Sequence, residues 1–307
     1  MKKLFYFSFM LLIMVLCSCS NLNNDRLNSE VSIITPKGIP FLSIGGLLEE
    51  ENLFIERVSG ADNLQTALVS GSHDIVIAPI NLGAKLYSLG KSQYKIAAVL
   101  TSNNAYIVTK EENKLDSIND LINEKVIAFG STGIPGNILK LIYNQNDSLN
   151  TDDIDFSFSS SAEVYSVFAG NSTHSKYTLM SEPEITKLKL KDNINVKKLD
   201  LCALLGVDVP QACVFINPNS TNKDDINKVL NMIDENIKYL NEKPIDYAKK
   251  VINLDKTFEL MGEEIIYSSI PYTNIEYKTA YESKEEIQNI LSVLGVKLPD
   301  DEFYYQK

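Results

Sequence analysis

Short apolar runs alternate with segments of helical periodicity, and this alternation constrains the fold of the chain more than any other feature. Ile75–Ala78 is a continuous apolar run of the kind found in buried strands, and the apolar residues of Leu82–Leu89 recur at helical spacing. Strands that alternate with helices predict a parallel sheet covered by helices on both faces. The strands expected in this first unit are Val31–Thr35, Leu53–Val58, Ile75–Ala78 and Ile96–Leu100, and the helices are Phe41–Glu51, Asn63–Ser70 and Leu82–Leu89.

The alternation restarts after Thr109, which predicts a second α/β unit of similar size. A chain of this length is long enough to divide into two lobes. The second unit is expected to hold the strands Lys125–Phe129, Ile154–Phe158 and Tyr177–Met180, with helices at Ile134–Tyr143, Ala162–Ala169 and Glu184–Leu190. The expected elements that follow are a strand at Gln211–Asn217 and helices at Asp224–Asn241, Pro244–Val251, Thr257–Ser268 and Lys284–Leu294.

The N-terminus has the pattern of an export signal. A basic start is followed by an apolar run from Leu4 to Cys17, which is shorter than the ~20 residues of a membrane-spanning helix. The junction that ends at Cys19 resembles the bacterial lipobox, which implies a signal peptide at residues 1–18 and a diacylglycerol on Cys19. An ordinary signal peptide with a chance cysteine is the alternative. We expect an Asn-rich, flexible tether at 19–30 and a location on the cell membrane, facing outside the cytoplasm.

Charge and cysteine content exclude several classes of function. The net charge is −11, which argues against a nucleic-acid partner because such binders present a basic face. Cys202 and Cys213 remain after the signal, and they are expected either as buried free thiols or as a disulfide. With no CxxC spacing and only two histidines, we expect neither a metal site nor a cofactor.

Two motifs resemble those of a family of transport proteins. Leu68-x-x-Gly71-x-x-Asp74-Ile75-x-x-x-Pro79 and Leu179-Met180-Ser181-Glu182-Pro183-x-x-Thr186 are similar to stretches in substrate-binding proteins of the nitrate/taurine/sulfonate/thiamine-precursor type. The lipobox, the loop at Pro36–Pro40 and the Gly-rich loop at Gly130–Gly136 add to the resemblance, which covers most of residues 31–220.

The resemblance implies an α/β, type II periplasmic-binding-protein fold with two lobes joined by a two-strand hinge. Lobe one would be 31–108 plus 212–307, and lobe two would be 109–211. It also implies that a small molecule is captured between the lobes and delivered to an ABC permease with its ATPase, that the protein is a monomer, and that it is not an enzyme.

Candidate ligand-binding residues follow the expected strands, because open α/β sheets bind ligands beyond the carboxyl ends of their strands. Helix N-termini at these ends offer free N–H groups, and Gly lets the backbone approach a ligand. A plain turn, a solvated loop or a helix cap is the alternative for most of the polar candidates, and a core position is the alternative for the tyrosine. The candidates are Lys37, Gly38, Asn81, Ser102, Asn103, Gly130, Ser131, Thr132, Gly133, Glu163, Glu182 and Tyr272.

Arginine content bears on the ligand. The chain has only Arg26 and Arg57, so a bidentate clamp on an anion is doubtful and a neutral or heteroaromatic ligand is favoured.

Two rival functions stay open at this point. One is an enzyme on the same fold, of the menaquinone or pyrimidine-precursor synthesis type. Against hydrolysis, there is no GxSxG elbow, and neither histidine has a recognisable Ser or Cys partner. The other rival is a receptor lipoprotein without transport.

Overall fold

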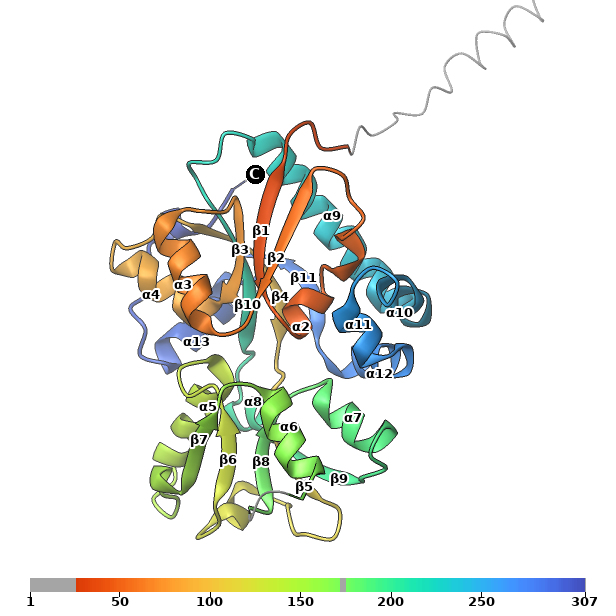
Figure 1. The fold of residues 1–307 in the computed structure, drawn as a ribbon. Helices are drawn as coiled ribbons and strands as arrows, with labels where there is room; N and C mark the ends of the chain where they lie inside the picture. Colours follow the sequence, from red (N-terminus) through yellow and green to blue (C-terminus); the bar gives the residue numbers. More distant parts are fainter. Residues whose placement is uncertain (1–25, 172–174, 307) are drawn as a thin grey trace, which may run out of the picture.

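Two sheets, each covered by helices, form the two lobes in Figure 1. The computed structural model describes residues 26–171 and 175–306. The upper sheet has the strand order β11-β4-β10-β3-β1-β2, and the lower sheet has the order β7-β6-β8-β5-β9. The upper strands are β1 (Val31–Pro36), β2 (Leu53–Val58), β3 (Ile75–Pro79), β4 (Lys95–Ser102), β10 (Pro210–Ile216) and β11 (Ile275–Thr279). The lower strands are β5 (Tyr106–Lys110), β6 (Val126–Phe129), β7 (Ile154–Phe158), β8 (Tyr177–Met180) and β9 (Val196–Asp200).

The two sheets share one topology. Neighbouring strands follow the order β2-β1-β3-β10-β4 in the upper sheet and β7-β6-β8-β5-β9 in the lower sheet. In both orders the second, first and third strands of a unit come first, one antiparallel strand comes next, and a fourth strand of the unit comes last. In each of these five-strand orders the antiparallel strand, β10 above and β5 below, is one that enters from the other lobe. The predicted two-lobed α/β fold is confirmed. The predicted parallel pairing holds for β1, β2 and β3 and for β6, β7 and β8, but the sheets are mixed because β5, β10 and β11 run against their neighbours.

Helices cover both faces of each sheet. Successive side chains of β3 point to opposite faces of the sheet, and both faces are packed, because Val76 and Ala78 belong to one apolar core and Ile75 and Ile77 to another. The upper lobe holds α2 (Ile39–Leu42), η1 (Gly45–Leu47), α3 (Ala61–Ser70), α4 (Ile80–Ser88), α9 (Lys223–Glu242), α10 (Pro244–Val251), α11 (Lys256–Met261), α12 (Glu263–Ser269), η4 (Ile270–Tyr272), α13 (Lys284–Val293) and η5 (Asp301–Phe303). The lower lobe holds η2 (Ile118–Leu121), α5 (Ile134–Asn144), η3 (Thr151–Asp153), α6 (Ser161–Ala169), α7 (Glu184–Leu190) and α8 (Leu201–Leu205). None of the helices within the described ranges is long and apolar enough to cross a bilayer.

The chain crosses between the lobes twice. It passes from β4 to β5 through residues 103–105, and it returns from α8 to β10 through residues 206–209. The crossings therefore precede the predicted boundaries at 108/109 and 211/212, because β5 pairs with β8 and β9 of the lower sheet while β10 pairs with β3 and β4 of the upper one.

Two helices expected as continuous are interrupted. In place of a helix at Phe41–Glu51, the structure has α2 and η1, separated where Ile44 adopts φ −119° and ψ 6°. In place of Thr257–Ser268 it has α11 and α12, separated at Gly262, whose φ of 88° lies outside the helical region. The strands β5, β9 and β11 and the helix α8 were not anticipated.

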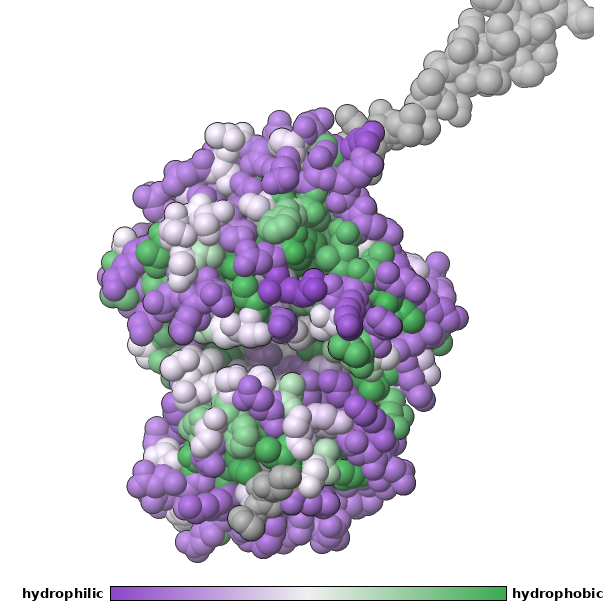
Figure 2. All heavy atoms as spheres, viewed as in Figure 1, coloured by the Kyte–Doolittle hydropathy of each residue, from purple (hydrophilic) through white to green (hydrophobic). Residues whose placement is uncertain are grey.

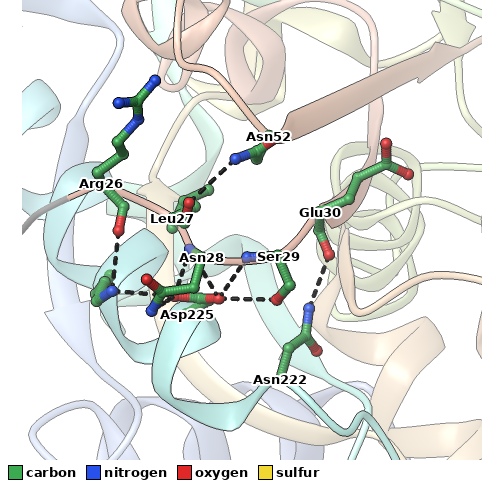
Figure 3. Close-up of polar contacts among 9 residues, drawn as sticks. Arg26, Leu27, Asn28, Ser29, Glu30, Asn52, Asn222 and Asp225 are labelled. Carbon is green, nitrogen blue, oxygen red and sulfur yellow. Dashed lines mark hydrogen bonds and ion pairs between the residues drawn. The ribbon is translucent and has the colours of Figure 1, made fainter.

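The segment just before β1 is fixed to the upper lobe (Figure 3). Leu27 is buried, and the Asp225 carboxylate of α9 accepts hydrogen bonds from the backbone N–H groups of Asn28 and Ser29. The Nδ2 group of Asn222 donates to the carbonyl of Glu30 at 2.8 Å. This part of the predicted tether is thus packed on the lobe rather than flexible. The predicted signal peptide, Cys19 and the rest of the predicted tether up to residue 25 lie outside the described residues.

Both cysteines of the body are buried free thiols. Cys202 lies in α8 and Cys213 in β10. Burial raises the pKa of the Cys202 thiol to about 12 and raises that of Cys213 further still. Of the two interpretations of these residues, the structure therefore shows free thiols rather than a disulfide.

Candidate functional site

The carboxyl ends of the strands in both lobes face a shared cleft. β1, β3 and β4 end toward it from the upper lobe, and β6, β7 and β8 end toward it from the lower lobe (Figure 1). Figure 2 shows the surface hollowed between the lobes, with hydrophilic and intermediate residues around the hollow. The arrangement brings the loops after the strands of two separate sheets into one place, as the sequence predicts.

The Gly-rich loop after β6 is tightly folded. Gly130 adopts φ 63°, and its carbonyl accepts from the N–H of Gly133 at 2.9 Å. A Cβ on Gly136 would lie 2.2 Å from that same carbonyl oxygen, so only glycine allows α5 to start so close to the loop. The Lys140 ammonium donates to the carbonyl of Ser131 at 2.5 Å. Because Gly133, the N-cap of α5, has no capping side chain, the N-terminus of this helix is available to a ligand group.

Asn81 bridges the two lobes. It lies in the first turn of α4, and its Nδ2 group donates to the carbonyl of Thr132, in the lower loop, at 3.2 Å. Its Oδ1 atom is buried, and no group among the described residues donates to it. Exchanging the two amide atoms would set Oδ1 against the Thr132 carbonyl oxygen, so the hydrogen bond fixes the orientation. Asn81 therefore presents an acceptor without a partner at a contact between the lobes.

The loop after β1 carries Lys37 and Gly38. Lys37 is exposed, and its backbone N–H donates to the carbonyl of Val58 at 3.0 Å. Gly38 is the N-cap of α2, and no side chain caps that helix. The backbone of this loop is thus fixed at the cleft, whereas the Lys37 side chain extends from it as an exposed cation.

Ser102 is the last residue of β4, and Asn103 begins the first crossing, where it holds the hinge together. The side chain of Asn103 donates to Asp208 at 3.0 Å and accepts from the N–H of Val209 at 2.8 Å, so it joins the two crossings. Its carbonyl accepts from Asn274 at 3.0 Å. A cavity of about 380 Å³ lies beside the hinge and is lined by Ser102, Asn103, Asn241, Ile270, Pro271, Asn274, Ile275 and Glu276. Hydrogen bonds within the hinge therefore occupy the polar groups of Asn103.

The two glutamates hold backbone at the starts of helices. The Glu163 carboxylate accepts from the N–H and hydroxyl of Ser159, each at 2.8 Å, and these bonds lower the pKa of Glu163. Glu182 is buried, and its carboxylate accepts from the N–H and hydroxyl of Thr186 at 3.0 and 2.8 Å. Burial raises the pKa of Glu182 even though these hydrogen bonds and Lys198 oppose the rise. The capping alternative thus describes Glu163, and Glu182 has a comparable role in the turn that starts α7.

Tyr272 contacts the opposite lobe. Its side chain is half exposed, and the ammonium of Lys198, from β9 of the lower lobe, lies 5.0 Å from its ring centroid. The same ammonium lies 4.7 Å from the ring of Tyr106 and 3.7 Å from Oε1 of Glu182. Lys198 was not a candidate residue, because β9 was not predicted.

Asn104, directly after a candidate residue, holds the lower side of the hinge. Its side chain accepts from the N–H of Glu182 at 2.9 Å and donates to the carbonyl of the same residue at 3.3 Å. The Ser181 hydroxyl donates to the Asn104 carbonyl at 2.9 Å. Sequence reasoning selected the loop but did not assign this role to Asn104, whose partners lie far along the chain.

One further polar cluster bears on the enzyme alternative. The Ser72 hydroxyl lies 2.8 Å from Nδ1 of His73, and Nε2 of His73 lies 3.1 Å from a carboxylate oxygen of Glu56. His73 does have a serine neighbour, so that part of the sequence interpretation is wrong. The cluster lies ahead of β3, at the edge of the sheet opposite the cleft, and follows the C-terminus of α3. The negative end of a helix disfavours an oxyanion, so the position does not suit hydrolysis. His174 lies outside the described residues.

Comparison with known proteins identifies the fold. No family model and no curated protein matches the sequence. Among solved structures, an ABC transporter protein from Parabacteroides distasonis is 19% identical with a TM-score of 0.71, covering 91% of this chain and 100% of that one. The periplasmic aliphatic sulphonate binding protein SsuA from Escherichia coli is 15% identical with a TM-score of 0.68, covering 91% and 92% of the two chains.

A third structure carries the name of the fold. The Candida albicans CA3427 gene product, described as having the generic periplasmic binding protein fold, is 17% identical with a TM-score of 0.54, covering 89% and 93% of the two chains. This chain has the periplasmic-binding-protein fold. At these identities the likeness concerns architecture, so the ligand has to be argued from the residues of the cleft.

Proposed function

We propose that this protein is an extracytoplasmic solute-binding lipoprotein of an ABC importer, which captures a small molecule between its lobes and delivers it to a permease. The observation that carries the proposal is the pair of matching sheets whose strand ends face one cleft, bridged there by Asn81 and Thr132. A ligand that contacts both lobes stabilises their closed arrangement, because the open form lacks one half of those contacts. Similar structures named as ABC transport proteins support the assignment.

The ligand we propose is neutral or heteroaromatic and carries a hydrogen-bond donor. The Arg26 guanidinium pairs with Glu51, and that of Arg57 pairs with Asp255 at 2.6 Å and lies 5.5 Å from the ring centroid of Phe41. Neither arginine is therefore free to clamp an anion. The unpartnered Oδ1 of Asn81 would accept from a donor group of the ligand, because a buried polar atom without a partner is costly.

Native mass spectrometry of freshly purified protein tests capture directly. A retained small molecule is expected, and small-angle X-ray scattering should show a smaller radius of gyration with it than after its removal by partial unfolding and refolding. Thermal shift then tests the ligand class with taurine, nitrate, ethanesulfonate and hydroxymethylpyrimidine. Stabilisation by the sulfonates or nitrate alone would overturn the neutral ligand, and an unchanged radius of gyration would count against capture by closure.

The lipid anchor on Cys19 is a separate part of the proposal. Cys19→Ala should release the protein from the membrane fraction, because a signal peptide alone leaves no acyl chains on the mature protein. Cys17→Ala is the matched control, since it keeps the proposed acceptor cysteine. Membrane retention of Cys19→Ala would contradict the anchor without affecting the proposed capture of a solute.

A further inference from the structure

Beyond Asn81, the lobes also meet where α12 of the upper lobe packs against α7 of the lower lobe (Figure 1). Tyr272 is the last residue of η4, the short helix that follows α12 directly, and it is 54% exposed. Its ring nevertheless lies against a cation of the other lobe, since the Lys198 ammonium is 5.0 Å from the ring centroid. A cation within about 6 Å of an aromatic centroid is attracted to the ring face.

Lys198 is held in place by its own lobe. Its ammonium lies 4.7 Å from the ring centroid of Tyr106, on the neighbouring strand β5, and 3.7 Å from the Glu182 carboxylate. That carboxylate is itself fixed by two hydrogen bonds from Thr186. The Glu182 backbone is fixed by two hydrogen bonds with Asn104, because its N–H donates to Asn104 Oδ1 and its carbonyl accepts from Asn104 Nδ2. The cation is therefore pre-positioned on the lower lobe, and Tyr272 is its only partner from the upper lobe among these contacts.

We propose that Lys198 and Tyr272 form a cation–π latch that favours the closed arrangement of the lobes before any solute binds. When the lobes separate, Lys198 keeps Tyr106 and Glu182, and the contact with Tyr272 is lost to water. This proposal deepens the proposed function, because it assumes that the lobes move relative to each other. The strength of a partly exposed cation–π contact corresponds to a shift of about two- to fivefold in the ratio of closed to open molecules.

The chain provides a matched control for the latch. Tyr281 is also exposed, at 62%, and also has a lysine ammonium over its ring, that of Lys284 at 5.9 Å. Both of these residues belong to the upper lobe, so this contact is unaffected when the lobes separate. Tyr281→Leu therefore removes an aromatic ring and a cation–π contact of the same kind without touching the contact between lobes.

Distances between the lobes can be measured by pulsed electron paramagnetic resonance. Nitroxides on Leu89→Cys and Glu112→Cys, both exposed positions on different lobes, report the separation, in full-length protein in which Cys17 and Cys19 are replaced by Ser. Cys202 and Cys213 are buried and should remain unlabelled. After removal of any retained solute, Tyr272→Leu should lower the closed-to-open ratio about two- to fivefold, and Tyr272→Phe and Tyr281→Leu should leave it unchanged.

A double-mutant cycle separates the latch from two unrelated effects. Lys198→Gln should lower the ratio as Tyr272→Leu does, and the two together should lower it no further than either alone. Additive effects, or an unchanged distribution in Tyr272→Leu while the parent shows two distances, would overturn the latch and leave the proposed function standing. A single distance in the parent, with solute and without it, would overturn both.

Discussion

Asp225 is buried at the start of α9 and fixes the start of the folded body, so replacing it should destabilise the protein more than replacing an exposed acidic residue of the same turn. Its carboxylate accepts from the N–H groups of Asn28 and Ser29 at 3.1 and 2.9 Å, and from the Ser29 hydroxyl at 2.8 Å. The Lys228 ammonium donates to it at 3.1 Å. These bonds position the chain beside Leu27, whose side chain is buried in the apolar core.

The expected loss in Asp225→Ala follows from these contacts. Hydrogen bonds to a charged group contribute about 1.5–3 kcal/mol each, but the freed N–H groups can reach water if residues 26–30 detach. We therefore expect the free energy of unfolding to fall by about 2–4 kcal/mol, which is less than the full sum for the two backbone hydrogen bonds. Asp224→Ala is the control, because Asp224 is exposed in the same first turn and should lose only a dipole interaction of about 0.3–1 kcal/mol.

Urea unfolding followed by circular dichroism measures the difference. Hydrogen exchange at the Asn28 and Ser29 amides, faster in Asp225→Ala only, would localise the effect. Equal midpoints and equal exchange in the two variants would refute the reasoning.

The stability that the Asp225 carboxylate contributes should also depend on pH. Burial alone would raise the pKa of this carboxyl, but the hydrogen bonds from Ser29, Asn28 and Lys228 together lower it to about 2. The folded pKa thus lies below the unfolded value of about 3.9, so the stabilisation is present above that value and is lost as the pH falls from about 4 to 2. The difference between parent and Asp225→Ala should be constant above about pH 5 and shrink below pH 4.

Three other predictions concern the loop, the bridge and the thiols. Gly136→Ala should destabilise the protein by about 1–3 kcal/mol in urea unfolding, because its Cβ must displace the Gly130 carbonyl; an unchanged midpoint would contradict the close packing. Asn81→Ala should weaken binding of the retained solute at least tenfold in isothermal titration. Asn137→Ala, which removes a bond to the same Thr132 carbonyl from within the lower lobe, should weaken binding less. A larger effect of Asn137→Ala would argue against Asn81 as a ligand residue. Iodoacetamide at pH 8 should leave Cys202 and Cys213 unmodified in the folded protein and alkylate both in urea, since burial raises both thiol pKa values. Prompt labelling of the folded protein would contradict the burial of these two thiols.

The sequence predicts the framework well because its signals are local. Leu53–Val58 and Glu184–Leu190 were predicted with the bounds that the structure shows, and both have clear periodicity and turn residues at their ends. β9 (Val196–Asp200) was not predicted because two lysines interrupt the apolar pattern of this short edge strand, which is stabilised by pairing with β5. β10 was predicted as a strand, but the antiparallel direction of β5 and β10 could not be predicted from alternation, since their neighbours are set by the crossings between lobes.

The sequence places the candidate loops at strand ends but does not predict the partners of their side chains. Strand ends locate the loops at Asn81 and Gly130–Gly133, and the structure brings these two together across the cleft. Whether a polar side chain is free or used depends on contacts far along the chain, such as Asn103 with Asp208 in the hinge. Tyr272 was selected as a candidate ligand-binding residue, and its contact with Lys198 could not be foreseen from sequence.

A crystal structure of the protein with the solute that it retains on purification tests the central claim most directly. The account predicts density in the cleft, with polar atoms of the solute within hydrogen-bonding distance of both Asn81 in the upper lobe and the Gly130–Gly133 loop in the lower lobe. Density in the cavity beside the hinge, or on one lobe alone with the cleft empty, would contradict it.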